Sequence, residues 1–156
     1  MHAVIGVVLW MLATAAWAAG DPDLKLSPKL RGALVAEMTG LKTGVAELTG
    51  SLATGDWPRA RQRALTIRDN YILKQKLSRA ELAELEHALP PDFQELDARF
   101  HRHAEALAHA AENHDGELAG FYLGRMIEGC IGCHARYATH TLPGFKAGTP
   151  ATGHAH

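Results

Sequence analysis

DGELAGFYLGRMIEGCIGCHARY, residues 115–137, is the part of the sequence from which the fold class can be inferred most directly. Its apolar side chains and its two cysteines recur every three or four residues, at Leu118, Tyr122, Met126, Cys130, Cys133 and Tyr137. This spacing places them on one face of an α-helix, and Asp115 before it is a favourable N-cap. Because such a helix has to bury its apolar face, the stretch predicts one helix of a packed helical domain.

The composition of the remaining chain also favours helices over strands. Beyond residue 18, the 156-residue sequence contains 22 Ala and 18 Leu but only six Val and Ile together. Ala and Leu favour helices, whereas strands are enriched in β-branched residues. This argues against an all-β fold and against a doubly wound sheet. The formal net charge is −1 and no basic block occurs, so nucleic-acid binding is not expected.

Two long amphipathic helices are predicted in the first half of the chain. From residue 28 to about residue 54, apolar residues recur at helical spacing, at Leu30, Leu34, Met38, Leu41, Val45, Leu48 and Leu52. Gly55 and Asp56 end this helix, and Asp56 with Pro58 opens a second helix that is predicted to run to about Lys76. Gly40, Gly44 and Gly50 weaken the first helix, so tertiary packing has to offset them.

The second half is predicted to hold one short and two long helices. Ser78 and Glu81 form a capping box that opens the short helix, which runs to about Leu89. A long helix then follows two prolines and carries an apolar face, made of Phe93, Leu96, Phe100, Leu107 and Ala111. We therefore predict an all-α domain over residues 19–140, an antiparallel four-helix bundle. Residues 141–156 are expected to be a flexible C-terminal tail.

Residues 1–18 have the pattern of a signal peptide. The apolar run from Ala3 to Ala16 is too short to span a bilayer and matches the hydrophobic region of a signal sequence. Ala16, Trp17 and Ala18 form an A-x-A cleavage site. An uncleaved N-terminal anchor is the alternative, because no Lys or Arg precedes the run. The expected location is the periplasm of a bacterium, an oxidising compartment.

Cys130-Ile131-Gly132-Cys133-His134 is a C-x-x-C-H motif that holds the only two cysteines of the chain. This spacing is the signature of covalent haem c attachment. Two thiols on neighbouring positions of a helical turn can reach the two vinyl groups of one porphyrin, and the following His can bind the iron. One covalently attached haem c is therefore the expected cofactor.

Three alternatives would use the same cysteines. A thioredoxin-like dithiol occurs at the start of a helix that follows a strand, whereas this motif lies late in a helix and no strand pattern is present. A zinc site would need further ligands at a matching spacing, and none lies nearby. A structural disulfide between these cysteines would close a very short loop and stabilise little.

The signal peptide, the four amphipathic helices and the C-x-x-C-H motif near the end of the last helix resemble the cytochrome c′ family. This is the four-helix-bundle class of c-type cytochromes, and the resemblance covers residues 28–140. In that family the position opposite the haem-binding His comes from the first helix, where low-spin members carry a Met. The segment from Glu37 to Leu41 is similar to this version. The resemblance thus implies that His134 and Met38 are the two axial ligands of the haem iron.

Further pocket residues are expected around this pair. The resemblance implies that Arg31 lies near the haem propionates. Three residues share the helical face of the cysteines and are expected along the macrocycle, namely Tyr122, Met126 and Tyr137. The chain departs from the family where Arg136 precedes the aromatic residue instead of following it. His103 lies near the apolar face of its helix and is a rival iron ligand, whereas His101 is predicted to lie off that face.

These inferences predict a periplasmic one-electron carrier and not an enzyme. Ligation by His134 and Met38 would hold the iron low-spin and raise its reduction potential. The expected partners are periplasmic or membrane redox proteins, and a homodimer is an open alternative. The alternative is that Met38 is an ordinary core residue that fills a gap between helices. In that case the resemblance implies a five-coordinate haem that binds NO or CO.

Overall fold

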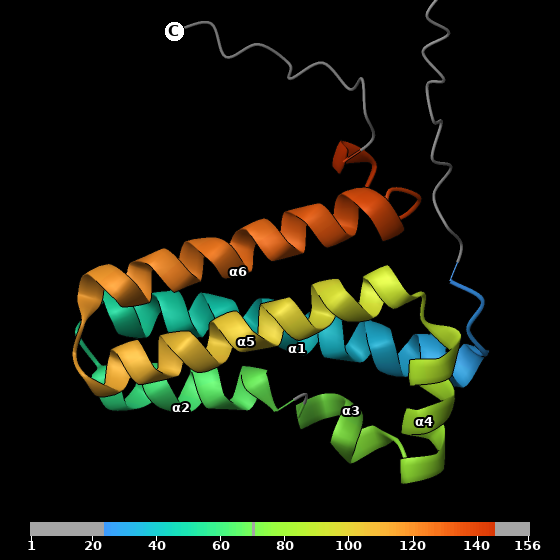
Figure 1. Cartoon of the computed structure of the whole chain (residues 1–156), viewed down its shortest axis with the longest axis horizontal. Coiled ribbons are helices and arrows are strands. Elements are labelled where there is room, and N and C mark those ends of the chain that lie inside the picture. The colour runs from blue at the N-terminus through green and yellow to red at the C-terminus, as the bar shows by residue number, and fades with distance from the viewer. Residues whose placement is uncertain (1–23, 70, 146–156) are drawn as a thin grey trace, which may run out of the picture.

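The computed structural model of the chain describes residues 24–69 and 71–145, and helices are its only regular elements there (Figure 1). The all-helical prediction is therefore confirmed. The elements are α1 (Pro28–Ala53), α2 (Trp57–Arg68), α3 (Tyr71–Lys76), α4 (Arg79–Ala88), α5 (Pro91–Glu112), α6 (Gly116–Tyr137) and a short 3-10 helix, η1 (Pro143–Phe145). The predicted signal peptide lies outside the described residues. Of the predicted tail, residues 141–145 form a turn and η1, and the remainder lies outside the described residues.

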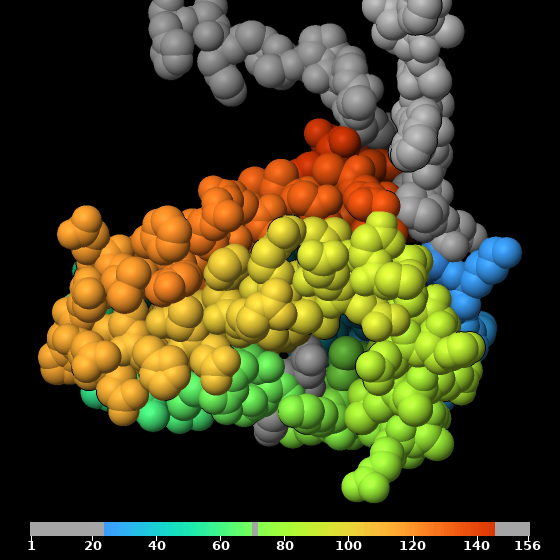
Figure 2. All heavy atoms as spheres, in the orientation of Figure 1, coloured from blue at the N-terminus to red at the C-terminus, as the bar shows by residue number. Residues whose placement is uncertain are grey.

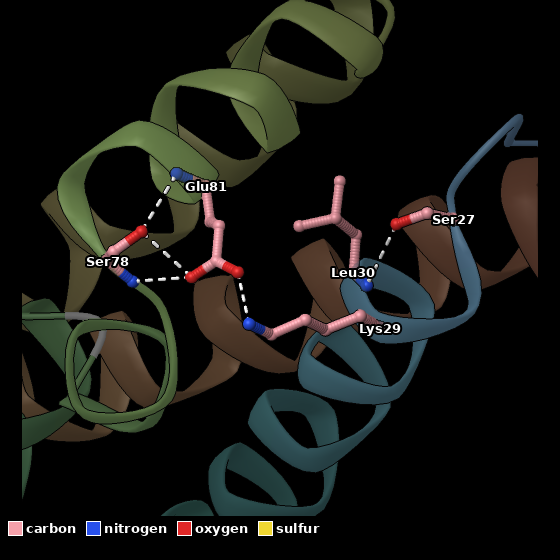
Figure 3. A network of polar contacts seen from close by, with 5 residues as sticks. All are labelled: Ser27, Lys29, Leu30, Ser78 and Glu81. Carbon is pink, nitrogen blue, oxygen red and sulfur yellow. Dashed lines mark hydrogen bonds and ion pairs between the residues drawn. The ribbon is translucent and has the colours of Figure 1, made fainter.

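α2, α4 and α6 begin where the sequence offers a side chain to cap them. Asp56 accepts from the backbone N–H of Arg59 at the start of α2 (3.2 Å), and Asp115 accepts from that of Leu118 at the start of α6 (2.9 Å). At the start of α4, Ser78 and Glu81 form the predicted capping box (Figure 3). The Glu81 carboxylate also binds the ammonium group of Lys29 on α1. These side chains satisfy N–H groups that have no partner within the helix.

The prediction of one continuous helix from residue 57 to Lys76 is wrong. The helix ends at Arg68, and a separate helix, α3, begins two residues after Asp69. Two side chains from other helices hold the backbone on either side of this break. His101 of α5 donates from Nδ1 to the carbonyl of Ile67 (2.8 Å), and the Glu37 carboxylate of α1 accepts from the N–H of Leu73 (2.8 Å). The carbonyl of Ile67 and the N–H of Leu73 therefore have hydrogen-bond partners even though the helix is interrupted between them.

The main core lies where α5 packs against both α2 and α6, with α1 closing the side along α2. Many of its residues are alanines, which allow the helices to approach closely, and its largest fully buried side chains are Leu48, Leu107 and Met126. Two glycines serve the same purpose on α1. A Cβ atom at Gly40 would lie 3.0 Å from Cγ1 of Ile72, and one at Gly44 would lie 3.3 Å from Cγ1 of Ile67. The close approach of α2 and α3 explains why α1 contains these glycines.

A second, smaller core joins α1 to the α3–α4 region and contains Leu30, Ala33, Leu77 and Leu85. The surface is hollowed between α5 and the α3–α4 region, and atoms of α1 are visible at its base (Figure 2). The start of α1, the start of α5 and the C-terminal end of α6 lie at the same end of the molecule (Figure 1). None of the helices in the described ranges is long and apolar enough to cross a membrane.

Candidate functional site

The C-x-x-C-H motif occupies the last two turns of α6. Cys130, Cys133 and His134 are all half-buried, and the two cysteines are free thiols. Residues three and four apart are neighbours on a helix surface, so both Cys133 and His134 lie one turn from Cys130. Cys130 packs against the main core. The motif therefore sits at the edge of the packed interior and not on a free loop.

Burial governs the chemistry of the two thiols. It raises the pKa of Cys130, and it raises the pKa of Cys133 to about 11, with smaller contributions from the charges of Asp97 and Cys130. Both groups are therefore neutral thiols at physiological pH. Dithiol oxidoreductases need the opposite, because the thiolate is their nucleophile and its pKa is lowered. The site is thus poorly suited to thiol–disulfide exchange.

His134 is placed in an apolar environment. Its ring meets the ring of Phe145 edge to face, with centroids 5.9 Å apart, so that η1 covers one side of the imidazole. Burial lowers the pKa of His134. The neutral imidazole that this favours is the form that binds a metal ion.

The end of α6 is fixed to the start of α5. The Arg136 guanidinium forms an ion pair with Asp92, and the Tyr137 hydroxyl group also hydrogen-bonds to Asp92. Tyr137 is buried, and its ring meets that of Phe93 edge to face at 5.2 Å. These contacts hold the last turn of α6, and with it the motif, against α5. Arg136 therefore serves as an anchor for α6.

Met38 lies on α1 and is half-buried. It belongs to neither core, and the same holds for Leu34 on α1, Leu96 on α5 and Cys133 on α6, which are also half-buried. The charge of Asp97 on α5 acts both on Glu37, the residue before Met38, and on Cys133. Asp97 thus lies within electrostatic range of a residue of α1 and of a motif cysteine on α6.

α6 also exposes large apolar side chains beside the motif. Ile127 and Ile131 are 44% and 49% exposed. They precede His134 by seven and three residues, so all three lie on one side of the helix. Neighbouring exposed apolar residues commonly mark a binding site.

The other residues that were predicted to line a haem pocket do not share one environment. Met126 is fully buried in the main core. The half-buried Tyr122 ring lies 6.0 Å from that of His103 on α5. Arg31 is exposed, and its Nη2 donates to the carbonyl of Leu24 (2.7 Å). Burial lowers the pKa of His103, as do the charges of nearby arginines.

Two buried ionisable residues were not found from the sequence. Glu37 is 3% exposed and His101 is 8% exposed. The prediction that His101 lies off the buried face of α5 is wrong, because α5 packs against α2 as well as α6 and so buries two faces. Among the described residues, Nε2 of His101 has no hydrogen-bond partner, and Asp97 Oδ1 lies 3.5 Å from it. A second row of small residues on α5, Ala104 and Ala108, was the available signal for this second face.

Two surface hollows lie away from the motif. The larger, of about 470 Å³, is lined by Arg59, Gln62, Arg63 and Thr66, and the other lies at the α1–α2 turn. Within the described ranges, no group of three or more His, Cys, Asp and Glu side chains could hold a bare metal ion. Comparisons with family models, with curated proteins and with solved structures find no match to this chain. The chemistry of its own residues therefore has to indicate the function.

Proposed function

We propose that this protein is an exported c-type cytochrome that carries one electron. Its long helices would form an antiparallel four-helix bundle of the cytochrome c′ kind, with one haem c attached to α6. The observation that supports this most directly is the environment of the motif. Two neutral, half-buried thiols and a half-buried imidazole lie within two turns of one helix, and α1 carries the half-buried Met38 that would face them in this proposal.

The residues present fit such a group. Cys130 and Cys133 would each add across one vinyl group, forming an S–C bond while the thiol hydrogen passes to the neighbouring carbon, so that no oxidant is consumed. His134 would supply a neutral nitrogen ligand and Met38 a thioether ligand. Haem c, when bound, supplies the one-electron chemistry, and the protein sets its potential and exposure.

The apolar surroundings of the motif suit a flat, largely apolar cofactor. Ile127 and Ile131 offer apolar surface beside His134, and Phe145 limits the access of water to the imidazole. Anchoring of α6 through Asp92 and Tyr137 would keep the attachment point fixed. A fixed coordination sphere favours electron transfer because little reorganisation accompanies it. The proposed partners are redox proteins of the periplasm or its membranes.

The competing dithiol and zinc functions are less well supported. The thiol pKa values are raised where a redox dithiol needs them lowered. A zinc site needs four ligands, and the described residues offer no such group around the cysteines.

The test is to produce the full chain in a bacterium that has a haem c maturation system. We expect a coloured protein whose colour survives acid extraction, with a low-spin spectrum and a sulfur-to-iron charge-transfer band in the oxidised state. Cys130→Ala with Cys133→Ala is the control and should abolish the colour. A protein that folds but takes up no haem would contradict the proposal. Covalent haem that is high-spin and binds CO would instead support a five-coordinate, gas-binding protein.

A further inference from the structure

Glu37 is the only buried carboxylate among the residues that the structure describes, and it precedes Met38 on α1. Its side chain lies in the interior, where burial raises its pKa. An interior carboxylate is costly unless hydrogen bonds compensate it. The burial of the Glu37 carboxylate therefore has to be explained by the groups that it contacts.

The carboxylate of Glu37 caps the start of α3. Oε2 accepts from the backbone N–H of Leu73 at 2.8 Å, and the N–H of Ile72 also contributes a hydrogen bond. These N–H groups belong to the first turn of α3, where no acceptor exists within the helix. Glu37 thus joins α1 to the break between α2 and α3.

α1 is held tightly along this side. Gly40, one turn after Glu37, brings the helix so close to α3 that an added Cβ atom would lie 3.0 Å from Ile72. Successive residues of an α-helix point about 100° apart. When Glu37 is fixed toward α3, the direction of the Met38 side chain is therefore fixed as well.

We propose that Glu37 is a positioning residue for Met38, because its hydrogen bond to Leu73 sets the rotation and depth of α1 at the level where Met38 meets the haem iron. This inference rests on the proposed ligation by His134 and Met38. Glu37 itself touches neither the iron nor the porphyrin in this account. It acts through the helix that carries the ligand.

The experiment compares three variants of the haem-loaded full chain at pH 7. Glu37→Ala removes the acceptor, and Glu37→Gln keeps an oxygen that can accept from Leu73. Glu47→Ala is the matched control, because Glu47 also joins α1 to a neighbour, through Arg63 on α2 (2.6 Å), but lies more than two turns from Met38. The readouts are the sulfur-to-iron charge-transfer band, the reduction potential and the free energy of unfolding.

For Glu37→Ala we expect the ratio of Met-bound to Met-free iron to fall about tenfold, as for loss of a residue that orients a metal ligand. The charge-transfer band should weaken, CO binding should appear and the potential should fall. Glu37→Gln should retain most of the band. Glu47→Ala should retain all of it, even where the free energy of unfolding decreases.

A full band in Glu37→Ala, with only the stability reduced, would show a purely structural role and overturn the inference. If Glu37→Ala does not accumulate, Glu37→Asp replaces it, since the shorter side chain cannot reach Leu73, and a full band there would overturn the inference equally. A wild-type protein with covalent haem but no charge-transfer band would overturn the Met38 ligation together with this inference. A failure of the inference on Glu37 can therefore be distinguished from a failure of the proposed Met38 ligation.

Discussion

In the proposed haem protein, the thioether of Met38 would distinguish an electron carrier from a gas-binding protein. Met38→Ala removes the only Met side chain that α1 offers. We expect the iron to become high-spin and to bind CO, and the reduction potential to fall, because the sixth ligand is lost. Optical spectra with and without CO, and a redox titration, would measure these effects. A low-spin spectrum with an unchanged potential would show that Met38 is not a ligand.

Met126 provides the matching test on α6, since it is fully buried in the main core. Met126→Ala should leave the spectrum low-spin but lower the free energy of unfolding by about 2–5 kcal/mol, the usual cost of truncating a buried Met. Urea unfolding followed by circular dichroism would measure it. A loss of the low-spin spectrum would show instead that Met126 contributes to the iron site.

The residues of the motif could be recognised from the sequence, whereas the polar residues around them could not. Cys130 and His134 are identified by a spacing that is contained within one helix. The burial of Glu37 and His101 depends on where α1 and α5 meet the break after α2. The hydrogen bonds at that break are tertiary, and the local signal for it is limited to the adjacent Asp69 and Asn70, residue types that favour caps and turns.

At the scale of a single helix, the glycines of α1 should respond differently to the same substitution. An added Cβ at Gly50 meets nothing within 4 Å, whereas at Gly40 it would lie 3.0 Å from Ile72. Gly50→Ala should therefore raise the free energy of unfolding by about 0.5–1 kcal/mol, the difference in helix propensity. Gly40→Ala should lose this gain because the Ile72 side chain must give way to the new methyl group. Denaturant unfolding of both variants would test the contrast, and equal effects would contradict it.

The contact between α1 and α4 should make stability depend on pH. Lys29 and then Ser78 lower the pKa of Glu81 from 4.5 to about 2 (Figure 3). Because the pKa is lower in the folded state, this stabilisation is complete above pH 4.5 and is lost as the pH falls toward 2. Glu81→Gln should remove this part of the pH dependence, and Lys29→Met should remove most of it. Melting temperatures between pH 6 and pH 2 would measure it, and an unchanged slope would contradict the assignment.

The starts of α2, α4 and α6 could be predicted because capping is local. Asp56, Ser78 and Asp115 each accept a hydrogen bond from an N–H group three residues ahead. The interruption between α2 and α3 was missed because the apolar spacing continues through it. Its hydrogen-bonding partners come from positions more than thirty residues away along the chain.

For the molecule as a whole, haem should order the stretch of α1 that includes Leu34 and Met38. These residues belong to neither core, so the protein alone gives them little packing. We expect haem attachment to slow amide hydrogen exchange around Leu34 and Met38 relative to the haem-free variant Cys130→Ala with Cys133→Ala. Hydrogen–deuterium exchange would measure the difference. Equal protection in both forms would argue against a haem contact on α1.

The proposed haem site would draw on the first and the last long helices, α1 and α6. An iron bonded to Met38 and held by the cysteines of α6 would act as a cross-link, closing a ring that includes nearly all of the folded chain. A ring of about 100 residues reduces the entropy of the unfolded chain by an amount worth about 4–5 kcal/mol. Breaking the Met–iron bond would open the ring into a linear chain. The oxidation state, through the strength of that bond, would then determine the topology in which the polypeptide unfolds.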